Sequence, residues 1–340
     1  MIRLSSLGDV VLTTPVFSDL KAAGAKTVAL TRRGFAPLYK NHPAVDDVWI
    51  YEERGFWGWM VEIRRQNFDI VLDLHGTPRS WFWTLFSKAS RRERFDKRTL
   101  ARRWLVWTKK VLSGLNGSVV DRYLEPLQRL GIPIGDRTPR LSLSPNERLS
   151  DSLEKRLGGG PFVAVAPGAQ HATKRWPASS FAKAADLLSA RLGSPGKPLP
   201  IVVLGASQDL PVVQEMLTHS SQPVQNLAGQ TTVRDMMLIL RRCALLLTND
   251  SGPMHVGVAL GVPTVAFFGP TVKAFGFFPS GPSVCVLEKQ ELPCRPCSLH
   301  GSDRCPLGHF NCLRGLSPED AVQASLSLLE GLSVKRICPI

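Results

Sequence analysis

The sequence predicts an α/β protein of two domains, each built on a parallel sheet covered by helices. The chain has 340 residues, more than one hydrophobic core usually organises. Short β-type runs alternate with helical patterns in both halves, which is typical of parallel sheets. A stretch rich in Pro, Gly and Ser, residues 131–145, separates the two halves. We therefore expect domains at residues 1–140 and 141–340.

In the first half, β-type runs alternate with segments of helical spacing. Strands are expected at residues 2–4, 27–30, 48–51 and 70–74. Residues 10–23 and 57–66 have the length and the apolar spacing of helices.

The second half repeats this alternation. Strands are expected at residues 162–166, 201–204, 244–248 and 264–268, and helices at 178–192 and 232–241. Ser317-Pro318-Glu319-Asp320 predicts the start of a last helix, with Ser as N-cap, Pro at the first position and acidic residues in the first turn. This helix belongs to the second domain or packs back on the first.

Composition narrows the classes of partner. The hydrophobic fraction of 44% and the charged fraction of 21% exclude a disordered chain. The formal net charge of +14 favours anionic partners: nucleic acid, an anionic membrane face or a phosphorylated substrate. Much of the excess lies between Arg79 and Lys110. Nucleic acid is disfavoured, because neither zinc-finger spacing nor an RNP string is present.

The apolar runs favour a cytoplasmic location. The longest, Val256 to Phe268, contains Pro263 and is too short to span a bilayer. No stretch has the basic, apolar and small-residue order of a secretory signal.

In open α/β sheets, ligands bind beyond the carboxyl ends of the strands, so functional residues are expected in the loops there. The first such loop is Ser5-Ser6-Leu7-Gly8-Asp9. Gly8 permits a tight turn, and Asp9 stands at a helix start, where backbone N–H groups are free. Asp9 is therefore either a helix cap or a catalytic carboxylate.

Two loops of the second half carry groups suited to phosphate. Ala166-Pro167-Gly168-Ala169 leads through Lys174-Arg175 into a helix, so it offers a glycine turn and positive charge, although Lys174 could also be merely solvated. Residues 248–255 read Thr-Asn-Asp-Ser-Gly-Pro-Met-His between a strand and a helix. That helix start suits a diphosphate, with hydroxyl-binding side chains beside it, or else the string is structural.

The fourth loop, residues 73–79, leads into a basic stretch rich in tryptophan. Its apolar side chains recur at helical spacing, and four basic residues stand off that stripe. This pattern favours a core-facing helix over lipid contact, and peripheral contact with an anionic membrane stays open. The stripe consists of Leu100, Trp104, Trp107, Val111 and Leu115.

Four cysteines lie close together in the sequence. Cys294, Cys297, Cys305 and Cys312 have a spacing compatible with tetrahedral thiolate coordination of a structural zinc ion, with His300 and His309 as substitutes. Free thiols or a disulfide are the alternatives.

Taken in order, these strings resemble glycosyltransferase family 9, the ADP-heptose:lipopolysaccharide heptosyltransferases. The matching strings are RLSSLGDVVLTTP, DLHG, PGA followed by KRWP, and NDSGPMHVGVALGVPTVAFFGPT. They extend over almost the whole chain. Four strings in fixed order, each in a strand–loop–helix context, are far more specific than any one alone.

The resemblance implies a GT-B fold, in which two Rossmann-like domains face each other across a central cleft. The N-terminal domain then binds the acceptor, and the C-terminal domain binds the nucleotide sugar. By motif, Asp9 is the implied general base and Lys174 the group that neutralises the leaving diphosphate. The implied reaction is an inverting transfer from ADP-heptose without an essential metal cofactor, since the family needs none and no DxD string occurs.

The resemblance also implies binding residues and partners. The acceptor is a phosphorylated glycolipid of the lipopolysaccharide inner core, reached by peripheral contact with the inner face of the cytoplasmic membrane. A nucleotide-sugar 2-epimerase of the same fold is the alternative function. The implied donor residues are Gly168, Lys174, Ser207, Thr231, Asp250, Ser251, Gly252 and His255. The candidate acceptor residues are Ser6, Gly8, His75, Arg79, Arg91 and Arg92.

Overall fold

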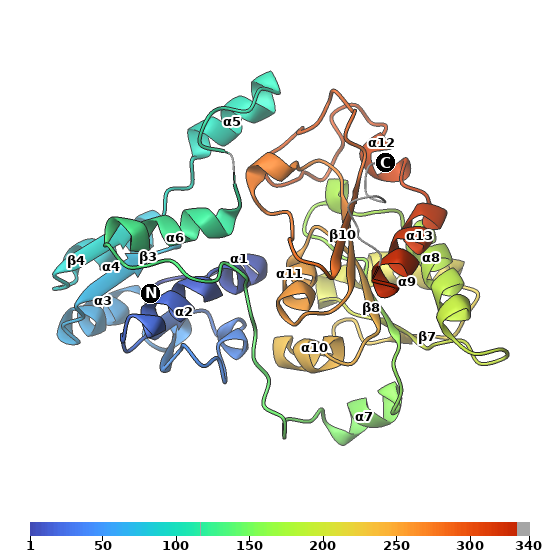
Figure 1. Cartoon of the computed structure of the whole chain (residues 1–340), viewed down its shortest axis with the longest axis horizontal. Helices are drawn as coiled ribbons and strands as arrows, with labels where there is room; N and C mark the ends of the chain where they lie inside the picture. The colour runs from blue at the N-terminus through green and yellow to red at the C-terminus, as the bar shows by residue number, and fades with distance from the viewer. Residues whose placement is uncertain (116, 332–340) are drawn as a thin grey trace. The chain divides into compact units, whose positions relative to one another are not determined.

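The computed structural model describes residues 1–115 and 117–331, and the chain divides into two compact units (Figure 1). The first unit comprises Met1–Thr99 and Gly114–Pro145. The second comprises Leu100–Ser113 and the described residues from Asn146 onward. Both units contain parallel strands with helices, so the predicted α/β class is confirmed.

The first unit holds two pairs of parallel strands joined through the start of the chain. β1 (Val28–Thr31) pairs with β2 (Asp47–Ile50), and β3 (Ile70–Asp73) pairs with β4 (Arg91–Arg94). Ile2 forms parallel bridges to Leu30 of β1 and to Asp73 of β3. The strand predicted at residues 2–4 is thus present only as a bridge between these pairs.

The helix predicted at residues 10–23 is two helices, α1 (Leu7–Leu12) and α2 (Thr14–Ala22). The break falls at Thr13, whose hydroxyl donates to the Val10 carbonyl oxygen at 2.8 Å. Pro15 then lies in the first turn of α2, where its missing N–H leaves no helical hydrogen bond unmade. The other helices of this unit are α3 (Gly55–Arg65), α4 (Pro78–Phe86) and α6 (Val119–Arg129), with short 3₁₀ turns η1 (Ala36–Leu38) and η2 (Tyr51–Glu53).

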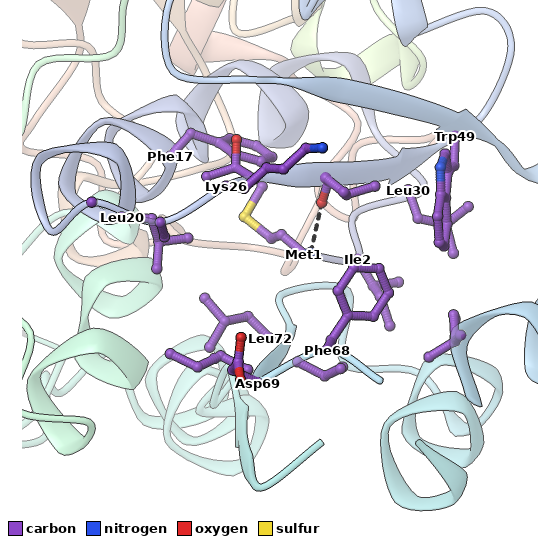
Figure 2. A pocket seen from close by; sticks show the side chains of 17 residues that line it. Met1, Ile2, Phe17, Leu20, Lys26, Leu30, Trp49, Phe68, Asp69 and Leu72 are labelled. Carbon is purple, nitrogen blue, oxygen red and sulfur yellow. Dashed lines mark hydrogen bonds between the residues drawn. The ribbon is translucent and has the colours of Figure 1, made fainter. Parts of the chain in front are cut away.

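An apolar pocket of about 280 Å³ lies at the amino ends of β1 and β3 (Figure 2). Phe17 and Leu20 of α2 line it, together with Phe68 and Leu72. The Met1 amino group donates to the Val28 carbonyl oxygen at 2.8 Å beside it. The pocket is therefore at the end of the strands opposite to the loops that carry the candidate site residues.

The second unit contains a six-stranded parallel sheet in the order β10-β9-β8-β5-β6-β7. The chain runs outward from β5 to β7 on one side and returns to build β8 to β10 on the other, which is the doubly wound Rossmann order. The loops after β5 and β8 therefore lie side by side at the switch point. The strands are β5 (Val163–Ala166), β6 (Ile201–Val203), β7 (Val224–Asn226), β8 (Leu245–Asn249), β9 (Thr264–Phe268) and β10 (Val284–Glu288).

Helices cover this sheet, and those predicted at 178–192, 232–241 and after Ser317 are confirmed. The last helix packs against α8, β9 and β10 of its own unit. Its N-cap is the one expected, because the Ser317 hydroxyl accepts a hydrogen bond from the Asp320 N–H at 3.0 Å. The helices are α7 (Asp151–Leu157), α8 (Ala178–Leu192), α9 (Leu210–His219), α10 (Val233–Leu240), α11 (Gly252–Ala259), α12 (Asn311–Arg314) and α13 (Pro318–Leu329), with 3₁₀ turns η3 (Ala172–Lys174), η4 (Ser207–Asp209) and η5 (Lys273–Phe275).

The prediction of a core-facing helix over the tryptophan-rich stretch is wrong. Helix α5 (Thr99–Thr108) ends before Lys109, whose φ of +61° is left-handed, so Val111 and Leu115 lie outside it. Leu100 and Trp107 are 82% and 80% exposed. The stripe thus faces solvent along the helix.

Helix α5 instead buries an arginine. The Arg102 guanidinium lies over the rings of Phe275 and Phe277, at 5.2 and 5.7 Å from their centroids. Lys109, just after the helix, donates to the Pro296 carbonyl oxygen at 2.6 Å. Cation–π contacts and a hydrogen bond to a backbone carbonyl oxygen therefore hold this segment on the second unit. The spacing of apolar residues in the sequence could not reveal these contacts.

Candidate functional site

Asp9 is the third residue of α1 and is held by three neighbours. The Ser6 hydroxyl and N–H donate to its Oδ2 at 2.7 and 3.2 Å, which closes a capping box. The Tyr123 hydroxyl donates to its Oδ1 at 2.7 Å, and Arg3 Nη2 lies 2.7 Å from its Oδ2. Asp9 is therefore a helix cap, and it is also the centre of a polar cluster that a cap alone does not need.

These contacts set the charge of Asp9. Burial by itself raises the pKa of the carboxyl, but the Arg3 charge and the hydrogen bonds from Tyr123 and Ser6 outweigh it and lower the pKa to about 2. Burial raises the pKa of Tyr123, which keeps its hydroxyl protonated as a donor. Asp9 is thus a fixed carboxylate at neutral pH.

Cationic and neutral groups surround this carboxylate. Burial, followed by the charges of Arg3 and Lys97, lowers the pKa of His75 to about 4, so the imidazole is neutral at pH 7. Asp73 Oδ1 accepts from the backbone N–H groups of His75 and Gly76 at 3.0 and 2.8 Å, which fixes the loop after β3. The charges that act on Lys97 include those of Arg3 and Asp9, so Lys97 belongs to the same cluster.

Only one of the other three candidate acceptor residues lies near the loop that holds His75. Arg79 lies in the first turn of α4, directly after this loop, with its guanidinium 5.1 Å from the centroid of Tyr51. Arg91 and Arg92 are the first residues of β4, and they pair with Ile70 and Val71 at the amino end of β3. The structure therefore does not bring these two arginines to the end of the sheet where His75 lies.

In the second unit, the loops after β5 and β8 meet through an ion pair. Lys174 Nζ lies 2.6 Å from Asp250 Oδ2, and these side chains are 16% and 6% exposed. The Thr271 hydroxyl donates to the same oxygen at 2.8 Å. Because an ammonium has three N–H donors, Lys174 keeps donors for a ligand at the switch point.

Asn249 fixes the spacing of these loops. Its side-chain oxygen accepts a hydrogen bond from the backbone N–H of Trp176 at 2.9 Å, and its amide nitrogen donates to the Pro167 carbonyl oxygen at 2.8 Å. Directly after it, Ser251 is the N-cap of α11, whose first residues are Gly252 and Pro253. A helix N-terminus with free N–H groups and a nearby ammonium is a suitable site for a diphosphate.

Glycines let the turns after β5, β6 and β7 approach closely. A Cβ on Gly168 would lie 2.2 to 2.5 Å from the carboxylate atoms of Asp209, and one on Gly229 would lie 3.1 Å from Ser207 Oγ. Asp209 Oδ2 accepts from the Ala206 N–H at 2.9 Å. The predicted Gly168 and Ser207 thus belong to neighbouring turns. The predicted Thr231 precedes the N-cap of α10, and His255 is buried in α11.

The cysteine cluster does not form a metal site in the described residues. Cys294, Cys297, Cys305 and Cys312 have free thiols. Within residues 1–115 and 117–331, no group of three or more His, Cys, Asp or Glu side chains is arranged to hold a metal ion. Spacing in the sequence made the thiols compatible with zinc, and the described residues show no such site.

Sequence reasoning missed several members of these clusters. Arg3 carried a signal, because a charged residue inside a β-type run at the start of a sheet needs a buried partner. Tyr123 carried none, since it is 114 residues from Asp9 and lies inside an unexceptional helix. Lys97, Asp209 and Thr271 were likewise unassigned, because only the fold shows which turns they contact.

Comparison with known proteins supplies a family. Residues 59–304 match the family described as "Glycosyltransferase family 9 (heptosyltransferase)". The lipooligosaccharide heptosyltransferase 2 of Campylobacter jejuni subsp. jejuni serotype O:2 is 34% identical over 177 residues, which are 51% of this chain and 52% of that protein. The chain thus spans about half the length of the first curated relatives it matches.

Solved structures share the fold of this chain over almost its whole length. The glycosyl transferase family 9 protein of Veillonella parvula DSM 2008 matches with a TM-score of 0.77 and 23% identity, covering 97% of this chain and 96% of that chain. E. coli ADP-heptose lps heptosyltransferase II matches with a TM-score of 0.75 and 23% identity, covering 97% of both chains. These matches confirm two Rossmann-like domains of the GT-B class. A putative UDP-N-acetylglucosamine 2-epimerase from Listeria monocytogenes is more distant, with a TM-score of 0.53 and 13% identity over 98% of this chain and 89% of that chain.

Proposed function

This chain belongs to glycosyltransferase family 9, and on that premise we propose that it transfers a heptose from ADP-heptose to a phosphorylated glycolipid of the lipopolysaccharide inner core. The observation that carries the proposal is the ion pair of Lys174 and Asp250 at the switch point of a Rossmann sheet, next to the N-terminus of α11. Relatives named as heptosyltransferases support the choice of sugar.

In this proposal the second unit binds the donor. Asp250 and Thr271 fix the position of the Lys174 ammonium, and its remaining N–H donors bind the diphosphate. The free N–H groups at the start of α11 add positive potential to the same oxygens. Charge that develops on the leaving ADP is then stabilised by groups that need no rearrangement, which is the source of rate acceleration we assign to Lys174.

Asp9 is the general base in this proposal. Its pKa of about 2 makes it a carboxylate at every physiological pH. Such a weak base accepts the proton as the new C–O bond forms, because an alcohol oxygen bonded to an electron-poor carbon is far more acidic than the free alcohol. The acceptor oxygen attacks the anomeric carbon on the face opposite to the departing diphosphate, so the configuration inverts.

The cations near Asp9 are suited to the acceptor's phosphate or carboxylate groups. Arg3 is neutralised by Asp9, whereas Lys97 and Arg79 add positive charge around the loop after β3. We assign Ser6, Gly8 and His75 to the same acceptor region, because they share that end of the sheet.

We further propose that the protein works in the cytoplasm, in peripheral contact with the anionic inner face of the membrane. The net charge of +14 favours such a surface. In the described ranges of the chain, no helix combines the length and the apolar character needed to cross a bilayer.

The test is an assay of ADP release from ADP-heptose with lipid A-type acceptors of increasing core length. We expect release that depends on both substrates, with a preference for one core length. Conversion of the nucleotide sugar without any acceptor would instead identify an epimerase. Transfer of a different sugar, with ADP-heptose inert, would contradict the proposed donor.

A further inference from the structure

Helices α3 and α4 expose large apolar side chains on their outer surface. The exposed fractions are 71% and 64% on α3, and between 41% and 45% on α4. In the described residues of the first unit, every exposed large hydrophobic side chain belongs to these two helices. We call this set the aromatic face, and it consists of Trp57, Val61, Trp81, Phe82, Leu85 and Phe86.

The exposed and buried positions of α4 follow helical geometry. Trp81 and Leu85 are four residues apart and so point the same way, and Phe82 and Phe86 repeat that spacing beside them. Trp83, on the opposite side, is fully buried and donates through its indole N–H to the Phe56 carbonyl oxygen at 2.9 Å. Because the core already has its own contacts, the outer row is not needed to fold the helix.

The outer side chains form an ordered surface. The rings of Phe82 and Phe86 stack with centroids 6.2 Å apart, and Trp81 meets Phe82 edge-on at 5.2 Å. On α4, exposed apolar side chains therefore contact one another along the helix, and a row of this kind marks a binding surface. Tryptophan, which the face presents at positions 57 and 81, is also enriched at the interface between lipid and water.

Cations border the aromatic face. Arg64 donates to the Phe86 carbonyl oxygen at 3.2 Å, and Arg92 donates to the Leu85 carbonyl oxygen at 2.9 Å, so both guanidinium groups are held at the end of α4. Residues 54–94 contain eight Lys or Arg and four Asp or Glu. One of these acids, Glu62, is buried and lies 3.0 Å from Arg65. The segment that carries the face therefore has four more basic than acidic residues.

We propose that the aromatic face is a docking surface for a bilayer that contains anionic lipids. The apolar rings enter the boundary between headgroups and acyl chains, and the bordering arginines contact lipid phosphates. Helix α4 starts directly after the loop that holds His75 and carries Arg79 in its first turn, so docking brings these proposed acceptor residues to the lipid surface. The choice of a membrane as partner rests on the proposed function, since a glycolipid acceptor is embedded in one.

Helix α5 also exposes tryptophans, but the aromatic face has the stronger case. The face joins two helices packed against each other and continues into the loop of the proposed acceptor region. A second copy of this chain is the rival occupant. Positive charge around the face opposes contact between two identical surfaces, because like charges would meet.

The experiment measures cosedimentation of the full chain with vesicles of phosphatidylethanolamine, with or without phosphatidylglycerol. Two variants with the same substitution are compared: Leu85→Gln on the aromatic face and Leu210→Gln on α9 of the other unit. Their side chains are 45% and 43% exposed, so their effects on folding should match. We expect Leu85→Gln to weaken binding to the anionic vesicles about three- to tenfold, since about half of a leucine side chain loses its apolar contact. Leu210→Gln should bind as the wild type does, and added salt should weaken binding of all three proteins.

The outcomes separate this inference from the proposed function. Absence of wild-type binding to anionic vesicles, or equal losses in the two variants, would overturn the docking surface. So would a wild-type dimer that Leu85→Gln converts to a monomer in sedimentation equilibrium. ADP release with a deacylated, water-soluble acceptor should be the same in both variants. If vesicle binding depends on Leu85 but no acceptor supports ADP release, the docking surface stands and the proposed transfer fails.

Discussion

The two proposed catalytic side chains are anchored in different ways. Asp9 receives contacts from Arg3, Ser6 and Tyr123, which come from the chain start and from a helix 114 residues away. Lys174 is anchored by one carboxylate, Asp250, across two loops that the Rossmann order already places together. Several donors act on one anion in the first unit, and a single ion pair positions the cation in the second.

The difference follows from what each group has to do. A base must stay ionised and aimed at one proton, so donors on both oxygens of Asp9 lower its pKa and fix its orientation. A cation that binds a diphosphate must keep donors available, so one partner is enough. We therefore expect the loss of a single neighbour to impair Asp9 only in part, and Lys174 to have no substitute.

Asp9→Asn tests the base directly and should have the largest effect. The amide keeps the size of the side chain but cannot accept the proton, so kcat should fall by about 10²- to 10⁴-fold. ADP binding, measured by calorimetry, should change little. Asp19→Asn is the matched control, since Asp19 is also a buried carboxylate of the first unit and accepts from the Gly135 N–H at 3.0 Å. Parallel loss of transfer and ADP binding in Asp9→Asn would make Asp9 a structural residue.

Lys174→Ala tests the cation and should reduce kcat by about 10²- to 10³-fold. The affinity for ADP should also fall, because the same ammonium binds the diphosphate in the ground state. Lys183→Ala is the control: Lys183 pairs with Glu319 at the same distance of 2.6 Å, on the surface of the same unit. Initial rates and ADP titration give the readouts. Similar kinetics for the two variants would show that the ion pair with Asp250 serves stability alone.

Tyr123→Phe asks whether one donor of Asp9 can be lost. A charge-assisted hydrogen bond is worth about 1.5–3 kcal/mol, so the pKa of Asp9 should rise by about one to two units and kcat should fall about tenfold. Carbon-13 NMR titration of the carboxyl and steady-state rates measure these changes. Tyr39→Phe, which removes a buried hydroxyl 3.2 Å from Thr13 Oγ1, should leave both unchanged. An unmoved Asp9 pKa in Tyr123→Phe would refute the positioning role.

The pKa of Asp9 also predicts how stability depends on pH. Its value of about 2 in the folded chain is below the ordinary value of about 4. Ionised Asp9 therefore stabilises the fold above pH 4, and this contribution is lost as the pH falls from about 4 to about 2. Tyr123→Phe should lose less stability over that interval than the wild type in acid titrations followed by circular dichroism, because its folded pKa is closer to the unfolded one.

The sequence could predict the parts of the fold that local patterns encode. The strands at 162–166, 201–204, 244–248 and 264–268 were found because they are continuous apolar runs. β4 was missed because Arg91–Arg94 is wholly charged and pairs at an edge, where tertiary contacts override propensity.

The candidate site shows the same division. Loops after strands were predictable, since the α/β topology fixes which strand ends carry ligands. The partners within the site were not, because Tyr123 and Asp9 meet only through the fold. The prediction that the apolar stripe of α5 faces the core was wrong for a related reason. Arg102 is buried against Phe275, and the tryptophans of the helix are exposed instead.

Gly168→Ala tests whether close packing also positions the donor loops, and it should have the smallest effect. The new methyl group would lie 2.2 to 2.5 Å from the Asp209 carboxylate, so that side chain must move and break its hydrogen bond from Ala206. We expect a loss of about 1–3 kcal/mol of stability in urea unfolding. Gly159→Ala is the control, since a Cβ there meets nothing within 4 Å. Adding Asp209→Ala removes the carboxylate atoms that the new methyl group would meet, so it should recover part of the lost stability. A double variant as unstable as the two single variants combined would locate the strain elsewhere in the turn, and the Lys174 loop would then depend on its ion pair alone.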